Sequence, residues 1–243
     1  MTAGSGNRVV ELQGGSATRD RLLQVAQALF AERGYRGTSL RDISARIGIK
    51  APSLLHHFSS KEQIYLAVLD RIFGRLEDAI GSVLIGTDSY QRRASSAIEG
   101  AIDFLARRPD YARLVWNEFI DENGIGLRLL KRRLPPLYAM AQNFIFQGQR
   151  DGAFRREVDP FQFVVSLNQI VSGYFTTAAM TRRLWNLNLL EAGAIESRKR
   201  HVLDLLRQTL FVSNASSPIR EDNPVRRATA ILDQTLLPEE QPK

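Results

Sequence analysis

The sequence contains no cysteine among its 243 residues. Disulfide bonds, thiolate zinc sites and a cysteine nucleophile are therefore excluded. The chain also lacks any apolar run near the ~20 residues that a membrane-spanning helix needs. Residues 1–15 show no basic start followed by an apolar stretch, so we do not expect a secretion signal. The sequence predicts a cytoplasmic protein without membrane contact.

The short motifs that mark common enzyme sites are missing as well. There is no GxSxG, no P-loop and no GxGxxG following a strand, and strand alternation is hard to find. The adjacent histidines His56 and His57 would point about 100° apart on a helix, and no acidic cluster lies near them in sequence. We therefore predict that the protein is not an enzyme and that it has no catalytic residue, cofactor or metal ion.

What the chain does have is an ordinary globular composition with an excess of positive charge. Apolar residues make up 44% and charged residues 24%, and the formal net charge is +7. Residues 1–62 carry nine Lys and Arg against five Asp and Glu, so the excess is concentrated near the N-terminus. Such a surface suits a polyanion such as DNA, although net charge also serves solubility alone.

Apolar residues recur every three to four positions through most of the chain, which predicts an all-α fold. Residues 1–17 are rich in Gly and Ser and are expected to be a disordered arm. The first helix is predicted over 19–33, capped by Thr18 and ended by Gly34.

Three further helices are predicted before residue 85. Thr38 is the expected cap of the second helix, which Gly48 ends. A short third helix follows at about 52–57. Ser59 or Ser60 then caps a long helix that runs to about residue 84.

The rest of the chain reads as helices separated by prolines, glycines and polar turns. They are predicted at 90–107, 110–121, 125–150, 160–184 and 195–212. Pro135 and Pro136 fall inside one of them and should kink or split it. Residues 213–223 form a predicted linker, and 224–236 could form one more amphipathic helix.

The first three helices after residue 17 have the lengths and spacing of a helix-turn-helix, with Gly48 in the tight turn. The third helix is too short to be stable alone. It would be held by apolar contacts, and its purpose would be to present its outer face to a groove of DNA. That outer face carries Lys50, Ala51, Ser53, His56 and His57. Lysine reaches phosphate or guanine, serine bonds to base edges, and alanine packs on a thymine methyl.

Residues 18–69 strengthen this interpretation through a specific resemblance. They read TRDRLLQVAQALFAERGYRGTSLRDISARIGIKAPSLLHHFSSKEQIYLAVL and are similar to the DNA-binding head of the TetR family of bacterial transcriptional regulators. The matching marks are Ala28-Leu29-Phe30, Gly34-Tyr35, Thr38-Ser39, Ile43-Ser44, Gly48-Ile49, His57-Phe58 and Lys61-Glu62. The resemblance divides the chain into an arm (1–17), a helix-turn-helix head (18–63), an effector-binding and dimerisation domain (64–212) and a linker with tail (213–243).

The resemblance also implies which side chains touch DNA. Thr38 and Lys61 would bind phosphate from helix N-termini, and His57 would bind the DNA backbone. The base-facing positions would be Lys50, Ala51 and Ser53, and His56 completes the set of contact candidates.

Three residues depart from the family's pattern. Pro52 replaces a common glycine, and proline is accepted in a first helical turn. Lys50 stands at a position that is often a serine cap, so the third helix is expected to start at Ala51. Leu55 replaces a tyrosine that touches phosphate, so we expect that contact to be lost.

Later helices carry many aromatic residues, and ordinary core packing explains most of them. The resemblance, however, implies an effector cavity among these helices, and ligand sites are apolar clefts with a few polar groups. The pocket candidates combine aromatic surface with amide or hydroxyl groups. They are Trp116, Asn117, Phe119, Tyr138, Asn143, Asn168 and Tyr174. The expected effector is small and largely apolar or aromatic.

The helices at 160–184 and 195–212 resemble the pair through which family members dimerise, although packing within one chain would use the same residues. The resulting hypothesis is a homodimer on a palindromic operator. The centres of the two half-sites would lie one or more turns of DNA apart, which is ~34 Å or a multiple of it. We expect a repressor released by its effector, with activation as the minority outcome. The alternatives are a helical small-molecule-binding protein with weak or lost operator recognition, and an interaction scaffold without a ligand.

Overall fold

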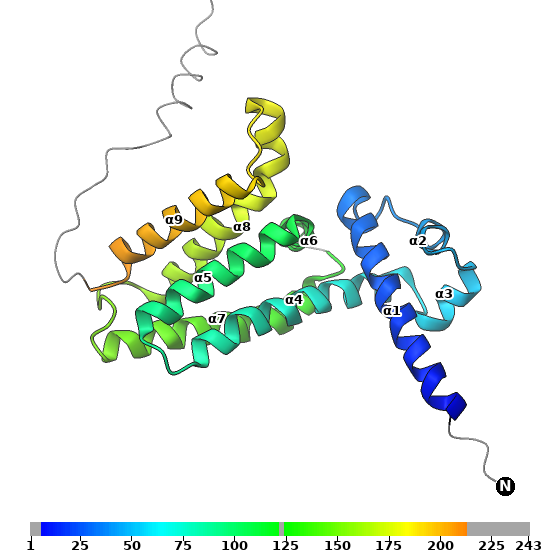
Figure 1. Cartoon of the computed structure of the whole chain (residues 1–243), viewed down its shortest axis with the longest axis horizontal. Helices are drawn as coiled ribbons and strands as arrows, with labels where there is room; N and C mark the ends of the chain where they lie inside the picture. The colour runs from blue at the N-terminus through cyan, green and yellow to red at the C-terminus, as the bar shows by residue number, and fades with distance from the viewer. Residues whose placement is uncertain (1–5, 122–123, 213–243) are drawn as a thin grey trace, which may run out of the picture. The chain divides into compact units, whose positions relative to one another are not determined.

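The computed structural model describes residues 6–121 and 124–212, with side chains from residue 18 onward. In this part the chain forms nine helices (Figure 1), and its one β-bridge joins Phe154 to Phe211. The all-α prediction is therefore confirmed. The helices are α1 (Gly6–Arg33), α2 (Leu40–Ile47), α3 (Ala51–His57), α4 (Lys61–Ile85), α5 (Tyr90–Arg107), α6 (Pro109–Ile120), α7 (Leu127–Arg150), α8 (Pro160–Trp185) and α9 (Ala192–Thr209).

The two ends of the chain were predicted to hold a disordered arm and a linker followed by a helix. The arm predicted to be disordered over residues 1–17 is helical from Gly6, as part of α1. No proline interrupts this stretch, so backbone hydrogen bonding continues through it. The predicted linker at 213–223 and the predicted helix at 224–236 lie outside the described residues.

The head is built on one apolar face of α1. Leu22, Ala26 and Phe30 recur at four-residue steps and are fully buried. Opposite them lie Ile43 of α2 and Leu54 of α3, which are also fully buried. Each such side chain contributes roughly 1.5–3 kcal/mol when removed from water. Short helices that are marginal alone are thus held by a shared core.

The N-cap of α2 is Ser39, one residue after the predicted Thr38. The Ser39 hydroxyl accepts a hydrogen bond from the Asp42 amide at 3.1 Å, and the Asp42 carboxylate accepts one from the Ser39 amide at 2.8 Å. Together they form a capping box, worth about 1 kcal/mol. The Ser39 hydroxyl also donates to the Asp42 carboxylate at 2.6 Å, and this bond, together with that from the Ser39 amide, lowers the pKa of Asp42 below its ordinary value. Gly48, with a φ of 82°, ends α2 in the left-handed conformation that glycine favours.

The remaining helices form the body of the protein, in which α4 packs against α5 and α7, and α8 against α6 and α7. Pro135 and Pro136 lie inside α7, which is continuous from Leu127 to Arg150, so they do not split this helix. Both prolines are exposed. Buried residues hold α7 on either side of them, including Leu130 before and Phe144 after, so tertiary packing outweighs the lost backbone bonds.

Among the described residues, no helix combines the length and apolar character that crossing a membrane requires.

Candidate DNA-binding face and effector region

The third helix presents one buried residue and a set of exposed ones. Leu54 is fully buried, whereas Ala51, Ser53 and His56 are exposed. The helix begins at Ala51, as predicted, and Lys50 is its N-cap without a side-chain cap bond. Because Leu54 anchors the helix to the core, the predicted base-facing side chains remain free to meet a groove.

Thr38 does not fit the role predicted for it. Its side chain is only 1% exposed, and its hydroxyl donates to the Gly34 carbonyl at 2.9 Å and lies 3.2 Å from that of Leu29. A hydroxyl buried in this way fastens the turn after α1 and has no path to a phosphate. We therefore remove the Thr38 side chain from the predicted DNA contacts.

Lys61 is also engaged within the head. Its Nζ donates to the carbonyls of Tyr35 and Thr38, both at 2.9 Å. The ammonium lies 4.2 Å from the centre of the Tyr35 ring, within reach of a cation–π interaction. An ammonium has three donors, so one remains for a phosphate. These bonds from Lys61 to the turn after α1 were not predicted from the sequence, because their acceptors lie 23 and 26 residues away.

The two histidines stay near the end of α3. His56 is exposed, His57 is half-buried, and their ring centres are 6.0 Å apart. In the part of the chain with described side chains, no group of three His, Cys, Asp or Glu is arranged to hold a metal ion. Both histidines keep their predicted place at the edge of the exposed face.

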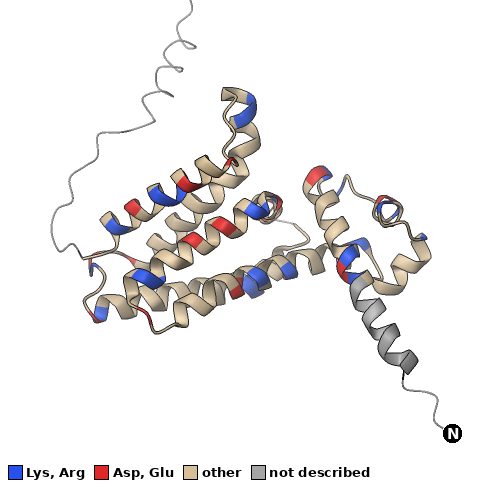
Figure 2. Ribbon diagram, viewed as in Figure 1, with Lys and Arg blue, Asp and Glu red and all other residues tan. Residues whose placement is uncertain are grey.

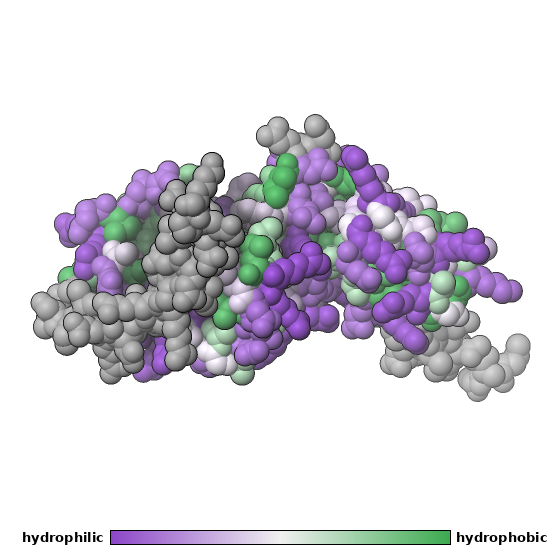
Figure 3. All heavy atoms as spheres, turned by 90° about the horizontal axis from the view of Figure 1, so that it is seen from above, coloured by the Kyte–Doolittle hydropathy of each residue, from purple (hydrophilic) through white to green (hydrophobic). Residues whose placement is uncertain are grey.

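The head also exposes cations that the sequence reasoning did not name. Arg36, Arg41 and Arg46 are exposed in the turn before α2 and on α2 itself. Figure 2 shows Lys and Arg along α2 and at the start of α3. In the space-filling view, hydrophilic side chains dominate the visible side of the head (Figure 3). Counting the charges beside the third helix would have found these arginines as phosphate-binding candidates.

The predicted effector residues are spread over three helices. Trp116, Asn117 and Phe119 lie on α6, while Tyr138 and Asn143 lie on α7. Asn117, Phe119 and Asn143 are exposed, and the other two are half-buried. Burial raises the pKa of Tyr138.

The two candidates on α8 are Asn168 and Tyr174, and both are half-buried. The Tyr174 hydroxyl donates to the Leu189 carbonyl at 3.0 Å, and the Arg198 guanidinium lies 4.8 Å from the centre of its ring. Tyr174 therefore ties α8 to the chain around α9.

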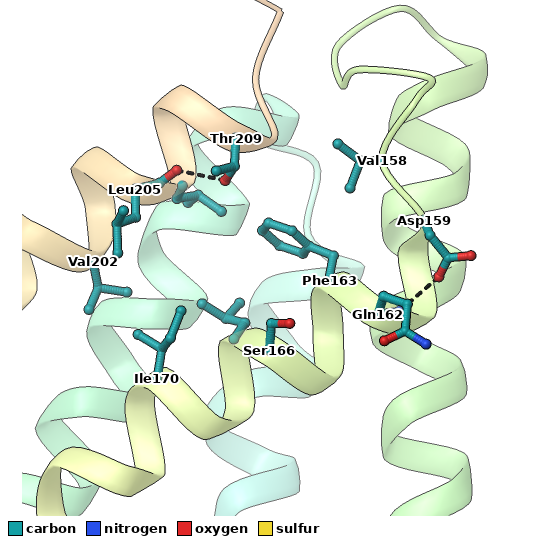
Figure 4. Close-up of a pocket in the computed structure, with 11 residues that line it drawn as sticks. Val158, Asp159, Gln162, Phe163, Ser166, Ile170, Val202, Leu205 and Thr209 are labelled. Carbon is teal, nitrogen blue, oxygen red and sulfur yellow. Dashed lines mark hydrogen bonds between the residues drawn. The ribbon is translucent and has the colours of Figure 1, made fainter.

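None of the seven effector candidates lines either of two hollows on the surface of the described part of the chain. The first, of about 360 Å³, lies between α8 and α9, where Phe163 and Ile170 face Val202 and Leu205 (Figure 4). This is the helix pair predicted to dimerise. The second, of about 570 Å³, lies between α4 and α7. Its lining residues are Glu77, Arg132, Arg133, Pro136, Leu137 and Met140.

A helix-turn-helix head with an exposed third helix, followed in the same polypeptide by an all-helical body, is typical of DNA-binding regulators. Comparison with known proteins agrees. The sequence model described as "Bacterial regulatory proteins, tetR family" matches residues 22–68, and that of the "Tetracyclin repressor-like, C-terminal domain" matches residues 93–206. The chain belongs to the TetR family of transcriptional regulators.

Relatives with established names include regulators of both signs. The transcriptional repressor KstR2 of Rhodococcus jostii is 31% identical over 153 residues, which are 61% of this chain and 74% of that protein. The transcriptional activator FasR of Mycolicibacterium smegmatis is 34% identical over 105 residues. That match covers 43% of this chain and only 48% of FasR.

Solved structures share the fold at lower sequence identity. The ketosteroid regulator KstR2 of Mycobacterium tuberculosis superposes with a TM-score of 0.65 at 21% identity, covering 80% of this chain and 95% of that one. AibR, solved with isovaleryl coenzyme A and operator DNA, has a TM-score of 0.63 at 19% identity, covering 77% and 97%. These likenesses establish the architecture of the head and the body.

Proposed function

We propose that this regulator is a repressor that binds a palindromic operator as a homodimer and is released by a small, largely apolar effector. The observation that carries the proposal is the exposed face of α3. Leu54 is buried while Lys50, Ala51 and Ser53 lie exposed. A helix held this way can enter the major groove and offer these side chains to base edges.

Dimerisation is supported by the surface of α8 and α9. Phe163 and Leu205 line an apolar hollow between these helices. An apolar surface of this kind favours burial against a partner. Two copies joined there would carry two heads, and a palindromic operator mirrors a two-fold dimer.

The nature of the effector is supported by the helical body and by one structural neighbour. AibR was solved with isovaleryl coenzyme A, a ligand with an apolar acyl group and an anionic nucleotide portion. Arg132 and Arg133 line the hollow between α4 and α7, so cationic groups lie beside an opening of the body. Arg133 is paired with Asp70 at 2.7 Å and with Glu77 at 3.0 Å, so an anion would compete with these acids. Two ligand classes are therefore to be tested: small apolar molecules, as proposed, and acyl coenzyme A thioesters, in which only the acyl group is small and apolar.

The deciding experiment is a selection of genomic DNA fragments on the purified full chain. We expect enrichment of a few fragments that share a palindrome, and release of the bound fragment when isovaleryl coenzyme A or another acyl coenzyme A is added. Free coenzyme A, which lacks the acyl group, serves as the matched control. Absence of any enriched sequence would support the alternative of a small-molecule-binding protein without operator recognition. Repression or activation is then read from transcription of the neighbouring gene.

A further inference from the structure

Helix α6 carries a carboxylate near each of its ends, one bonded to α1 of the DNA-binding head and the other to α4, the helix that begins in the head and continues into the body. Near its start, Asp110 accepts a hydrogen bond from Gln27 of α1 at 2.5 Å. Near its end, Glu118 accepts one from the Tyr65 hydroxyl of α4, also at 2.5 Å. Gln27, Glu118 and Tyr65 are 1%, 7% and 2% exposed. A helix of the body is therefore bonded to α1 and α4 through buried polar groups.

The Glu118 carboxylate is enclosed on its other side as well. Its second oxygen accepts a hydrogen bond from the Gly126 amide at 2.7 Å. A Cβ at Gly126 would lie 2.5 Å from that oxygen and 2.8 Å from a methyl of Leu69, so any other residue there would displace the carboxylate or Leu69. Burying a carboxylate is costly unless it is hydrogen-bonded. The turn before α7 therefore supplies a backbone hydrogen bond to the buried carboxylate. An apolar side chain at position 118 would not use this bond.

From Tyr65 an unbroken series of contacts leads to the helix-turn-helix. The Tyr65 ring lies 4.9 Å from the ring of Phe30, edge to face, and 5.1 Å from that of Tyr35. Tyr35 lies under the Lys61 ammonium, which also bonds to the Thr38 carbonyl at 2.9 Å. Thr38 directly precedes the N-cap of α2. Packed groups therefore connect Glu118 to the residue before the N-cap of α2.

We infer that Glu118 is a positioning residue that sets the geometry of the helix-turn-helix through Tyr65, so that the body regulates DNA binding at this contact. The inference rests on the proposed function, because it concerns control of the same DNA-binding face. The effector candidates Trp116 and Phe119 belong to the same helix, within two residues of Glu118. Coupling between two sites of a protein is typically about 5- to 150-fold in affinity.

The contact is tested in the full-length chain with Tyr65→Phe, Glu118→Gln and the double variant. Tyr65→Phe removes one hydroxyl and keeps the ring contacts, so it preserves the fold even if Glu118→Gln does not. Tyr111→Phe is the matched control. The Tyr111 hydroxyl of α6 accepts a hydrogen bond from Arg75 of α4 at 3.1 Å, and Arg75 is not part of the contacts that lead from Glu118 to α2. Circular dichroism verifies that each variant is folded.

The first measurement is amide hydrogen exchange at residues 35–39 in the free protein. We expect each single variant to speed exchange there several-fold, and the double variant to add nothing further, because both changes break the same contact. Tyr111→Phe should leave this segment unchanged. Unchanged exchange in Tyr65→Phe, or an equal effect of Tyr111→Phe, would overturn the inference.

The second measurement is affinity for a duplex that the wild-type chain has selected from genomic DNA. We expect at least a fivefold change for Tyr65→Phe and less than twofold for Tyr111→Phe. Affinities within twofold for all variants would overturn the regulatory role, even with altered exchange. If the wild-type chain selects no DNA, the proposed function fails, and the exchange measurement alone decides whether Glu118 is coupled to the head.

Discussion

The head and the body differ in how their functional surfaces are encoded. In α3 a single step along the helix separates buried Leu54 from Leu55, which is 45% exposed, so local periodicity alone defines the outward face. In the body, the candidate ligand residues come from α6, α7 and α8 and line neither hollow. A recognition surface on one short helix is a local property, whereas a ligand cavity depends on how distant helices pack.

The largest effect is expected at the anchor of α3. Replacing Leu54 by Ala should lower the free energy of unfolding by about 2–5 kcal/mol, because the side chain is fully buried. Leu55→Ala is the matched control and should change it by less than about 0.5 kcal/mol. Denaturant unfolding followed by circular dichroism measures both. Equal losses of unfolding free energy in the two variants would contradict a buried Leu54 and an exposed Leu55.

Base reading is expected at Ser53, which is exposed on α3. Ser53→Ala should change discrimination between operator bases by about 1–3 kcal/mol. Arg46→Ala, which removes an exposed phosphate-binding candidate of α2, should instead weaken all sequences alike and reduce the salt slope by about one. Binding to a library of single-base operator variants at several salt concentrations separates the two. An unchanged base preference in Ser53→Ala would contradict base contact by this residue.

A smaller effect is expected at the cap of α2. Ser39→Ala should cost about 1 kcal/mol of stability, because its hydroxyl accepts the Asp42 amide. Ser59→Ala is the control, since Ser60 caps α4. Thermal unfolding compares them, and no loss in Ser39→Ala would mean that the capping box adds nothing.

The smallest effect is a pH dependence from Asp42. Bonds from Ser39 hold its folded pKa below the ordinary value of 3.8. The group therefore adds stability above its unfolded pKa, and this is lost as the pH falls through that value toward the folded one. Asp42→Asn should flatten the acid limb of the stability curve. An identical curve in both proteins would contradict the assignment.

Much of this structure follows from local sequence signals. The helix predicted at 90–107 has those bounds in the structure, and α8 begins at Pro160 as predicted. In both cases a cap or a proline precedes the apolar repeat. The start of α3 at Ala51 was predicted instead from the resemblance, in which Lys50 stands at the position of the cap.

The errors arose where distant contacts decide. Thr38 looked like a cap, but its hydroxyl is bonded to the carbonyls of the preceding turn. The phosphate contact predicted for Lys61 stays a prediction, but its bonds to the turn after α1 were not predicted. The continuity of α7 through Pro135 depends on packing against α4 and α8. Glu118 gave no signal as a buried group, because its partners are 53 and 8 residues away.

The most direct test of the central claim is the affinity of the full-length chain for its selected genomic duplex and for a scrambled duplex of equal length, measured across salt concentrations. If α3 reads bases while the surrounding cations bind phosphates, the selected duplex should bind at least about a thousandfold more tightly. Both affinities should fall linearly with the logarithm of salt concentration. Equal affinity for the two duplexes, or binding that does not respond to salt, would contradict a sequence-reading head.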